Sequence, residues 1–328
     1  MLNKINYEFI LEDTYTKMDS IMEEYKNKNI CISYSGGSDS DTLMFLFKNK
    51  GYNIKGLFFN TGIEYNATLE HIQYMRSLGF TIDIIKAARS VPNGTKKFGL
   101  PFINKRVSEM LERMQKHNFD FKNDGNKTYE ELTNKYLKLV SALKWWCNFY
   151  DNGSILNIAY NKKLKEFLIE FGLPFRVSGK CCDGAKKDPA KIYAKENKID
   201  LMILGIRKAE GGVRASAYDR CYISAKSKSY SMYFPMFWWN NEIKKKYDED
   251  NNIIHSKCYT EYGLERTGCA GCPFGRSFEN ELNIINTYEK KLYKGINNIF
   301  NYSYEWTKKY NYYKNGILTC VENAKKFI

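Results

Sequence analysis

Hydrophobic and polar positions along the first 90 residues follow two different periods. Short apolar runs that fit strands lie at residues 30–34, 54–60 and 81–85. Stretches with helical spacing lie before and between them, at residues 8–28, 41–49 and 66–78. Strands that alternate with helices in this way are typical of a parallel sheet covered by helices.

The same alternation returns later in the chain, after a long helical interruption. We expect further strands at residues 175–178 and 201–206, with a helix near 189–197. The fold that we predict is α/β, with a parallel twisted sheet and helices on both faces.

The interruption spans roughly residues 100–173. Apolar residues such as Leu132, Leu139 and Trp146 recur there at helical spacing. A helical insertion of this kind could form one wall of a substrate cleft, or it could be a purely structural bundle. The chain ends in a loop-rich and then helical, strongly aromatic region.

A glycine-rich segment joins the first predicted strand to the helix that follows it. Residues 33–42 read Ser-Tyr-Ser-Gly-Gly-Ser-Asp-Ser-Asp-Thr. Glycines let backbone amides turn toward an anion, and the N-terminus of a helix adds positive potential. The hydroxyls of Ser35, Ser38 and Ser40 can donate to phosphate oxygens. An ordinary capped turn is the alternative, but the strand before and the helix after favour phosphate binding. No lysine follows the glycines, so the segment is not a Walker loop.

The net charge changes the expected partners of the chain. There are 51 basic and 37 acidic residues, which gives a net charge of +14. Such an excess suits a polyanion, either a nucleotide or a nucleic acid. Codon bias toward lysine on a solvated surface explains the same excess without any such partner. The candidate basic patches are Lys162, Lys163, Lys165, Lys186, Lys187, Lys226, Lys228, and Lys244 to Lys246.

Cysteines form the second group of residues with candidate chemistry. The tandem pair Cys181-Cys182 is followed later by Cys269-x-x-Cys272, within a total of nine cysteines. Four thiolates suit a soft metal centre, and a [4Fe-4S] cluster is commonly held by four cysteines. Structural zinc fits the same number of ligands, and the Cys-x-x-Cys pair also fits a redox dithiol. Cys221 and Cys258 could each replace one of the adjacent pair, so the ligand set stays open.

Features of the whole sequence bear on the location of the protein and on its number of domains. No apolar run approaches the length of a membrane span, and the N-terminal residues lack the apolar core of a signal peptide. We therefore expect a cytoplasmic protein without a membrane partner. With 328 residues the chain is long enough for one large or two modest domains. We predict a first domain over residues 1–215, insertion included. We predict a Cys-rich and helical region over 216–328 that shares the metal site with Cys181-Cys182.

Taken together, these motifs resemble the phosphoadenylyl-sulfate (PAPS) reductase family of the PP-loop ATP pyrophosphatase superfamily. The segment Ser35 to Ser40 looks like the PP-loop, and the tandem and distal cysteines look like the cluster ligands of the iron–sulfur-containing branch. Asn60-Thr61-Gly62 resembles the family's segment after the second strand. Gly205 to Glu210, followed by Arg214, resembles the stretch whose arginines reach the anionic end of the nucleotide. Arginine suits that task because its guanidinium group binds anions with two parallel hydrogen bonds.

The resemblance implies roles for named residues. It implies catalytic roles for Asp39, Arg207 and Arg214, to which we add Cys258 as a spare thiol near the cluster that could carry sulfur. The residues that it implies for binding ATP with Mg²⁺ are Ser35, Gly36, Gly37, Ser38, Asp39, Ser40, Thr61 and Gly62. Those that it implies for the [4Fe-4S] cluster are Cys181, Cys182, Cys269 and Cys272.

Two departures from the reductases shape the functional hypothesis. The PP-loop is intact, whereas reductases typically carry a degraded loop because their substrate is already adenylylated. The C-terminus has Cys320 but lacks the Glu-Cys-Gly-x-His motif of the reductases. In both features the chain resembles sulfur-inserting relatives such as tRNA thiolases and DNA-phosphorothioation sulfurtransferases.

We therefore predict an ATP-dependent sulfurtransferase that forms AMP and pyrophosphate. It would adenylylate an acceptor, with tRNA or DNA as the candidate nucleic acid and a cysteine desulfurase as the candidate sulfur donor. One alternative is a sulfonucleotide reductase whose nucleophile is Cys258 or Cys320. Another is a non-catalytic nucleotide- or nucleic-acid-binding module with a structural metal.

Overall fold

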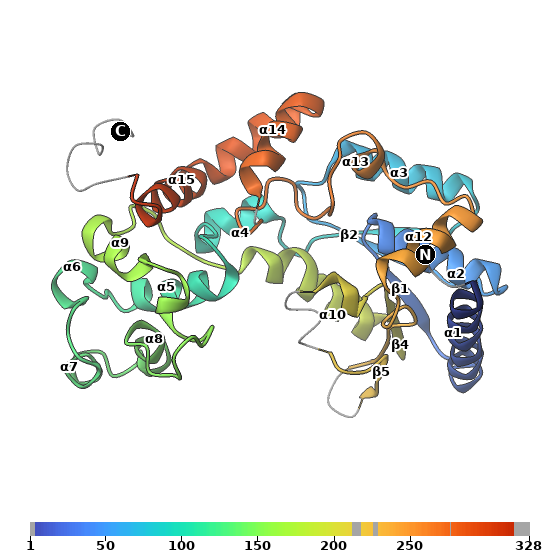
Figure 1. Cartoon of the computed structure of the whole chain (residues 1–328), viewed down its shortest axis with the longest axis horizontal. Coiled ribbons are helices and arrows are strands. Elements are labelled where there is room, and N and C mark those ends of the chain that lie inside the picture. The colour runs from blue at the N-terminus through green and yellow to red at the C-terminus, as the bar shows by residue number, and fades with distance from the viewer. Residues whose placement is uncertain (1–3, 212–217, 226–228, 276, 318–328) are drawn as a thin grey trace. The chain divides into compact units, whose positions relative to one another are not determined.

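The computed structural model describes residues 4–211, 218–225, 229–275 and 277–317. The chain divides into two compact units, drawn together in Figure 1. The sheet unit comprises residues 1–90, 183–270 and 286–289, and the helical unit comprises residues 91–182, 271–285 and 290–328. The sequence-based division at residue 215 remains a prediction.

A six-stranded sheet forms the centre of the sheet unit. Its strands are β1 (Ile30–Tyr34), β2 (Gly56–Asn60), β3 (Ile82–Lys86), β4 (Leu201–Leu204), β5 (Tyr222–Ile223) and β6 (Ser231–Tyr233). The order across the sheet is β3-β2-β1-β4-β6-β5, and every neighbouring pair is parallel except β5 with β6. The register places Ile32 beside Gly56 on one side and Ile203 on the other. β1 is therefore a central strand, and the loop that follows it lies at the carboxyl edge of the sheet.

Helices cover both faces of this sheet, as the alternation within the strands requires. Ile32 and Tyr34 of β1 face a large core shared with the first helices and α12 (Asn241–Asp250). Cys31 between them faces a smaller core beneath α10 (Asp188–Glu196). The helices of the sheet unit are α1 (Lys4–Glu24), α2 (Ser38–Asn49), α3 (Asn66–Ser77), α10 (Asp188–Glu196), α12 (Asn241–Asp250) and α13 (Lys257–Thr260). Shorter turns are the π-helix η2 (Asp183–Lys187) and the 3-10 helix η3 (Lys208–Glu210).

The helical unit is built around an aromatic core. Trp145, Trp146 and Phe167 are fully buried in it, and Tyr310 joins them from the last helix. Its elements are α4 (Val91–Phe98), α5 (Lys105–Lys116), α6 (Phe121–Asp124), α7 (Tyr129–Lys135), α8 (Val140–Trp146), η1 (Ile158–Tyr160), α9 (Leu164–Phe171) and α15 (Lys290–Lys314). Helix α14 (Phe278–Tyr288) begins in this unit and ends in the 286–289 segment of the sheet unit.

The predicted α/β fold with helices on both faces is confirmed, and the structure corrects some of its details. The expected strand at residues 175–178 is wrong, because only an isolated bridge between Leu100 and Val177 forms there. The short strands β5 and β6 were not predicted. Among the described residues, no helix combines the length and the apolar character that crossing a membrane requires.

Candidate nucleotide site

The PP-loop, residues 35–40, is held in shape by the hydroxyl of Ser40. That oxygen accepts hydrogen bonds from the backbone amides of Ser35 (3.2 Å) and Gly37 (3.1 Å), and it donates to the carbonyl of Gly37 (2.7 Å). Gly37 has an extended backbone and caps α2, which begins at Ser38. The loop is therefore fixed by its own serine at the N-terminus of a 12-residue helix, an arrangement that suits an anion.

Two glycines are required by the close approach of neighbouring segments. Gly36 has φ +69°, and a Cβ atom placed there would lie 2.6 Å from Cγ2 of Thr68. A Cβ atom at Gly205, just after β4, would lie 2.9 Å from the carbonyl oxygen of Asp39. Larger residues at these positions would push the loop away from the sheet edge.

The PP-loop faces a cavity of about 930 Å³, which we call the PP-loop cavity. Serine hydroxyls and loop backbone form one wall, and the segment after β4 forms another. Cationic side chains of Lys186, Arg207 and Arg266 also line the cavity. The size of the cavity falls within the range of small-molecule and cofactor sites.

Arg207 is the best-anchored cation of this site. It is only 6% exposed, its Nε lies 2.7 Å from Oδ1 of Asp39, and its Nη1 donates to Oδ1 of Asn241 at 3.0 Å. Its backbone amide also donates to Glu210 at 3.2 Å. The guanidinium group is thus held in one orientation before any ligand binds, which suits recognition of a phosphate.

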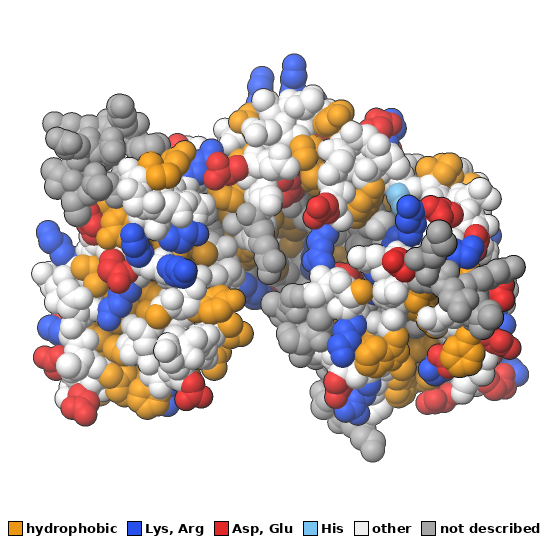
Figure 2. All heavy atoms as spheres, viewed as in Figure 1, with side chains coloured by type: hydrophobic (Ala, Val, Ile, Leu, Met, Phe, Trp, Pro, Cys, Tyr) orange, Lys and Arg blue, Asp and Glu red, His pale blue; other side chains and the backbone are white. Residues whose placement is uncertain are grey.

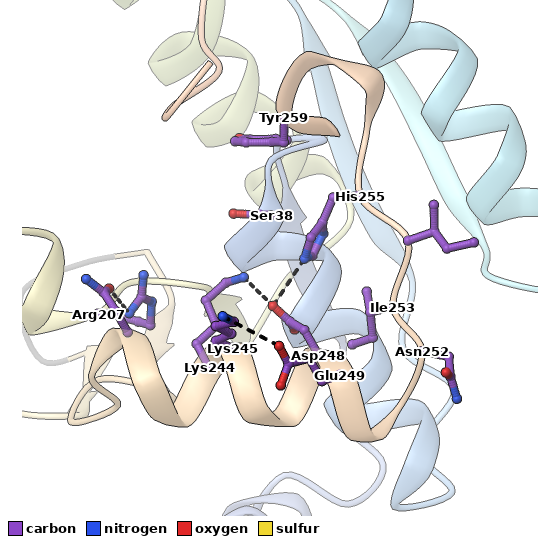
Figure 3. A pocket seen from close by; sticks show the side chains of 12 residues that line it. Ser38, Arg207, Lys244, Lys245, Asp248, Glu249, Asn252, Ile253, His255 and Tyr259 are labelled. Atoms are coloured by element: carbon purple, nitrogen blue, oxygen red, sulfur yellow. Dashed lines mark hydrogen bonds and ion pairs between the residues drawn. The ribbon is translucent and has the colours of Figure 1, made fainter. Parts of the chain in front are cut away.

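A second cavity, of about 780 Å³, lies beside α12 and is shown in Figure 3; we call it the α12 cavity. It shares Ser38, Arg207, Asn241 and Tyr259 with the PP-loop cavity. Its remaining wall comes from α12 and from the segment between α12 and α13, which carries His255.

Behind the PP-loop lies a buried charge network centred on Asp41. This carboxylate is fully buried, accepts a hydrogen bond from Tyr34 Oη (2.7 Å), and lies 3.0 Å from Nε2 of His71. Nδ1 of His255 lies 2.9 Å from the same carboxylate, and Nε2 of His255 lies 3.1 Å from Asp248.

The network continues from Asp248 to two more residues. Its carboxylate lies 2.5 Å from Nζ of Lys244 and accepts a hydrogen bond from Thr42 Oγ1 at 2.6 Å. Because the members lie on β1, α2, α3, α12 and the segment after α12, the network ties these elements together beneath the first turn of α2.

The protonation of His255 follows from its two carboxylate partners. Burial lowers the pKa of His255, but hydrogen bonds with Asp248 and Asp41 and the charge of Asp41 outweigh burial and raise that pKa to about 9. Burial raises the pKa of Asp41, yet the two histidines bring it below its usual value. The ring of His255 is therefore a cation at neutral pH, with each nitrogen donating to a carboxylate.

Some of the residues predicted to bind ATP line the PP-loop cavity and others do not. Ser35, Gly37, Ser38, Asp39 and Ser40 line the PP-loop cavity. Thr61 and Gly62 do not: Thr61 is fully buried and donates to Glu64 at 2.6 Å, and Gly62 is exposed. Arg214 and Cys320 lie outside the described residues.

Cys258 lies in the core of the sheet unit. It is fully buried and its Sγ lies 3.6 Å from Oγ1 of Thr68. Burial raises the pKa of the Cys258 thiol. A buried thiol with a raised pKa is a poor nucleophile, so the catalytic role of Cys258 remains a prediction that this conformation does not favour.

The four predicted metal ligands are divided between the units. Cys269 belongs to the sheet unit, where its Sγ donates to Thr61 at 3.6 Å, and Cys181, Cys182 and Cys272 belong to the helical unit. The part of the chain that the structure describes holds no group of three or more His, Cys, Asp or Glu residues that could bind a metal ion. The ligand role of the four cysteines remains a prediction.

The fold and this site define a PP-loop nucleotide-binding α/β protein. Residues 29–174 match the model of the phosphoadenosine phosphosulfate reductase domain, and this match confirms the resemblance drawn from the motifs. No curated protein matches the chain.

Several solved structures are similar in fold. PAPS reductase from Candida auris, in a phosphate complex, is 12% identical with a TM-score of 0.43, over 82% of this chain and 96% of that one. The tRNA thiolase NcsA from Methanococcus maripaludis, with its [4Fe-4S] cluster, is 14% identical with a TM-score of 0.36, over 97% and 85%. NH3-dependent NAD synthetase from Campylobacter jejuni is 12% identical with a TM-score of 0.35, over 96% and 99%. At these values none of them bears on function.

Sequence reasoning missed the network behind the loop. Asp41 follows the PP-loop motif directly, yet its role depends on partners far away in the chain. One signal was available, since the chain has only three histidines. Two of them, His71 and His255, meet at this one carboxylate.

Proposed function

We propose that the chain is an ATP-dependent enzyme that activates an acceptor by adenylylation, releasing pyrophosphate, in preparation for sulfur transfer. The observation that carries this proposal is the intact PP-loop, which is fixed by Ser40 and faces a cavity of about 930 Å³ beside the anchored Arg207. A loop built to hold phosphates suits a substrate that still has its β- and γ-phosphates.

Different residues of the PP-loop cavity would have different roles in such a reaction. Loop amides and the hydroxyls of Ser35 and Ser38 would bind the phosphates, and Arg207 would stabilise the charge that develops as pyrophosphate leaves. Lys186 and Arg266 extend the positive wall of the cavity. Because Arg207 is already oriented by Asp39 and Asn241, it needs little reorganisation when the substrate binds.

The ion that accompanies ATP has a fitting ligand. Asp39 lines the cavity, and the described contacts use only its Oδ1, with Arg207. Carboxylate oxygen is a ligand that Mg²⁺ prefers, so Asp39 would hold the ion, which neutralises phosphate charge when bound.

ATP–pyrophosphate exchange tests the proposal. The full chain is incubated with ATP, Mg²⁺, labelled pyrophosphate and acceptor pools of tRNA, DNA and small metabolites. We expect exchange with one pool and a loss of at least about tenfold in Arg207→Ala, since a hydrogen-bonded charge contact of this kind contributes about 1.5–3 kcal/mol. Arg220→Ala is the matched control, because Arg220 is exposed, pairs with Asp219 and does not line the PP-loop cavity. Exchange with none of the pools would refute the proposal, and ATP binding without exchange would favour a non-catalytic module.

The match to the phosphoadenosine phosphosulfate reductase domain favours a second candidate function, that of a sulfonucleotide reductase. Its nucleophile would be Cys258, after opening of the segment that buries it, or Cys320. Release of labelled sulfite from adenylyl sulfate or phosphoadenylyl sulfate, lost in the corresponding Cys→Ser variant, would support this candidate. No turnover with either sulfonucleotide would remove it.

We also propose that Cys181, Cys182, Cys269 and Cys272 bind a [4Fe-4S] cluster, which would supply the sulfur chemistry. The support for this is the soft donor set of two cysteine pairs. No step of the reaction is assigned to the cluster. Anaerobic purification followed by iron and acid-labile sulfide analysis tests it, with about four of each expected per chain for a cubane cluster. Zinc or no metal would overturn it.

A further inference from the structure

The α12 cavity shares a wall with the PP-loop cavity. Ser38, at the start of α2, and the guanidinium group of Arg207 border both spaces. Figure 3 shows Arg207 and the side chains of α12 along one side of the α12 cavity, with Ser38 and Tyr259 above them. A phosphate chain bound at the loop could therefore extend from one space into the other.

The charges around the α12 cavity favour an anion of modest size. Four cations line it, namely Arg207, Lys244, Lys245 and His255, against the two carboxylates of Asp248 and Glu249. Hydroxyls of Ser38 and Tyr259 and the amide of Asn241 add polar groups without negative charge.

Arg207 has donor capacity left for such an anion. Its Nε and Nη1 are used by Asp39 and Asn241, and among the described residues Nη2 makes no hydrogen bond. The side chain is more than nine-tenths buried and borders the α12 cavity. Because Asp39 and Asn241 already hold the guanidinium group, Nη2 can donate to an anion in the cavity without a change in the orientation of the side chain.

Lys245 is the most available cation of the α12 cavity. Its Nζ lies 3.7 Å from Glu249, whereas Lys244 Nζ lies 2.5 Å from Asp248. Lys245 is also 78% exposed, so its pairing with Glu249 is a weak surface contact. An anion that enters the cavity can therefore take Lys245 from Glu249 at little cost.

We propose that the α12 cavity, which adjoins the PP-loop cavity at Ser38 and Arg207, binds inorganic pyrophosphate, the product of the reaction; this rests on the proposed function. In that reaction an acceptor oxygen forms a bond to the α-phosphorus of ATP. The bond from that phosphorus to the bridging oxygen breaks, and the oxygen leaves with the electron pair on pyrophosphate. AMP stays on the acceptor in the PP-loop cavity, and pyrophosphate moves past Ser38 and Arg207 toward α12.

Calorimetric titration of the full chain with Mg²⁺-pyrophosphate, in the presence of saturating AMP, tests this site. We expect Lys245→Ala to raise the dissociation constant of pyrophosphate about three- to fivefold, as loss of one exposed charge contact would. Glu249→Gln removes the competing carboxylate, and we expect it to tighten pyrophosphate binding about twofold. A variant that binds more tightly cannot be explained by misfolding. The affinity for AMP should stay unchanged in both variants.

Lys246→Ala is the matched control on the same helix. Lys246 pairs with Asp250 at 2.9 Å, lies over the ring of Tyr7, and does not line the α12 cavity. The proposal is overturned if pyrophosphate does not bind, if Lys245→Ala and Glu249→Gln leave its affinity unchanged, or if they shift the affinity for AMP equally. Because this titration involves no turnover, its failure is distinct from a failure of ATP–pyrophosphate exchange.

Discussion

Two buried aspartates, one in each unit, differ in how far their cationic partners are exposed to solvent. Asp41 in the sheet unit is paired with His71 and His255, whose side chains are only 4% and 16% exposed. Asp124 in the helical unit is equally buried, but its partners Lys127 and Lys135 are 42% and 51% exposed. The first carboxylate is enclosed with its cations, whereas the second is reached by lysines from the surface.

The difference shows where in the molecule both members of an ion pair are enclosed. Exposed lysines keep part of their hydration, so the ion pairs around Asp124 form easily. They stabilise the link between α6 and the end of α7, where Lys135 lies. Enclosed histidines must lose their hydration, which is costly unless the partners fit closely. The enclosed network lies beneath the first turn of α2, where the PP-loop must keep its shape. On the face in Figure 2, by contrast, Lys and Arg side chains are scattered among acidic and hydrophobic ones.

Asp41→Asn would break the enclosed side of this comparison and should have the largest effect. The substitution keeps the volume but leaves the buried ring of His255 with only one carboxylate. Removing one partner of a buried ion pair costs about 3–5 kcal/mol. We expect a loss of that size in the free energy of unfolding, measured by urea denaturation near pH 7.

Asp124→Asn is the matched variant in the helical unit. We expect it to cost about 1 kcal/mol, because its lysines can return to water. The cost of Asp124→Asn should also shrink as salt is raised, whereas that of Asp41→Asn should not, since screening acts on exposed pairs. Equal costs for the two variants would contradict the distinction between them.

The sequence predicted the local part of the site and not its long-range part. The strand, the two glycines and the serines of residues 33–40 are contiguous, so their arrangement follows from neighbouring residues. Asp248 and His255 reach Asp41 only because α12 packs beside α2, and no periodicity in the sequence records that contact. The same reason explains the wrong strand prediction at residues 175–178. The apolar run there forms a single bridge, with Leu100, and does not join the edge of a sheet.

The pH dependence of stability sharpens the comparison further. The folded pKa of His255, about 9, lies above its unfolded value near 6.5, so its stabilising contribution is complete below pH 6.5. That contribution is lost as the pH rises through 9, and it amounts to about 3 kcal/mol. The pKa values of Asp41 and Asp248 are lowered, so their contributions are lost in acid instead.

We therefore expect the free energy of unfolding to fall between pH 6.5 and 9.5 in the parent chain, as followed by urea denaturation. In His255→Gln this alkaline fall should be largely absent. His117→Gln is the control, because His117 caps α5 in the helical unit and should leave the profile unchanged. A parent profile that is flat over this range would mean that His255 is neutral in the folded protein.

Lys309→Met tests a third way of burying charge and should have the smallest effect. Lys309 is 9% exposed, and its ammonium group lies 3.9 Å and 4.5 Å from the ring centroids of Phe171 and Trp306. Burial lowers the pKa of Lys309. Methionine keeps an unbranched apolar chain and removes the cost of desolvating the charge, which offsets a lost cation–π contact of about 0.5–2 kcal/mol.

The expected change for Lys309→Met is within about 1 kcal/mol of zero in urea denaturation, since the two contributions oppose each other. Lys309→Ala is the control, because it also removes the methylenes of this buried side chain and should cost more than methionine. A loss of several kcal/mol in Lys309→Met would show that the cation itself stabilises the helical unit. In that case enclosed charge would matter in both units, and the contrast between Asp41 and Asp124 would reflect their particular partners instead of the nearness of Asp41 to the PP-loop.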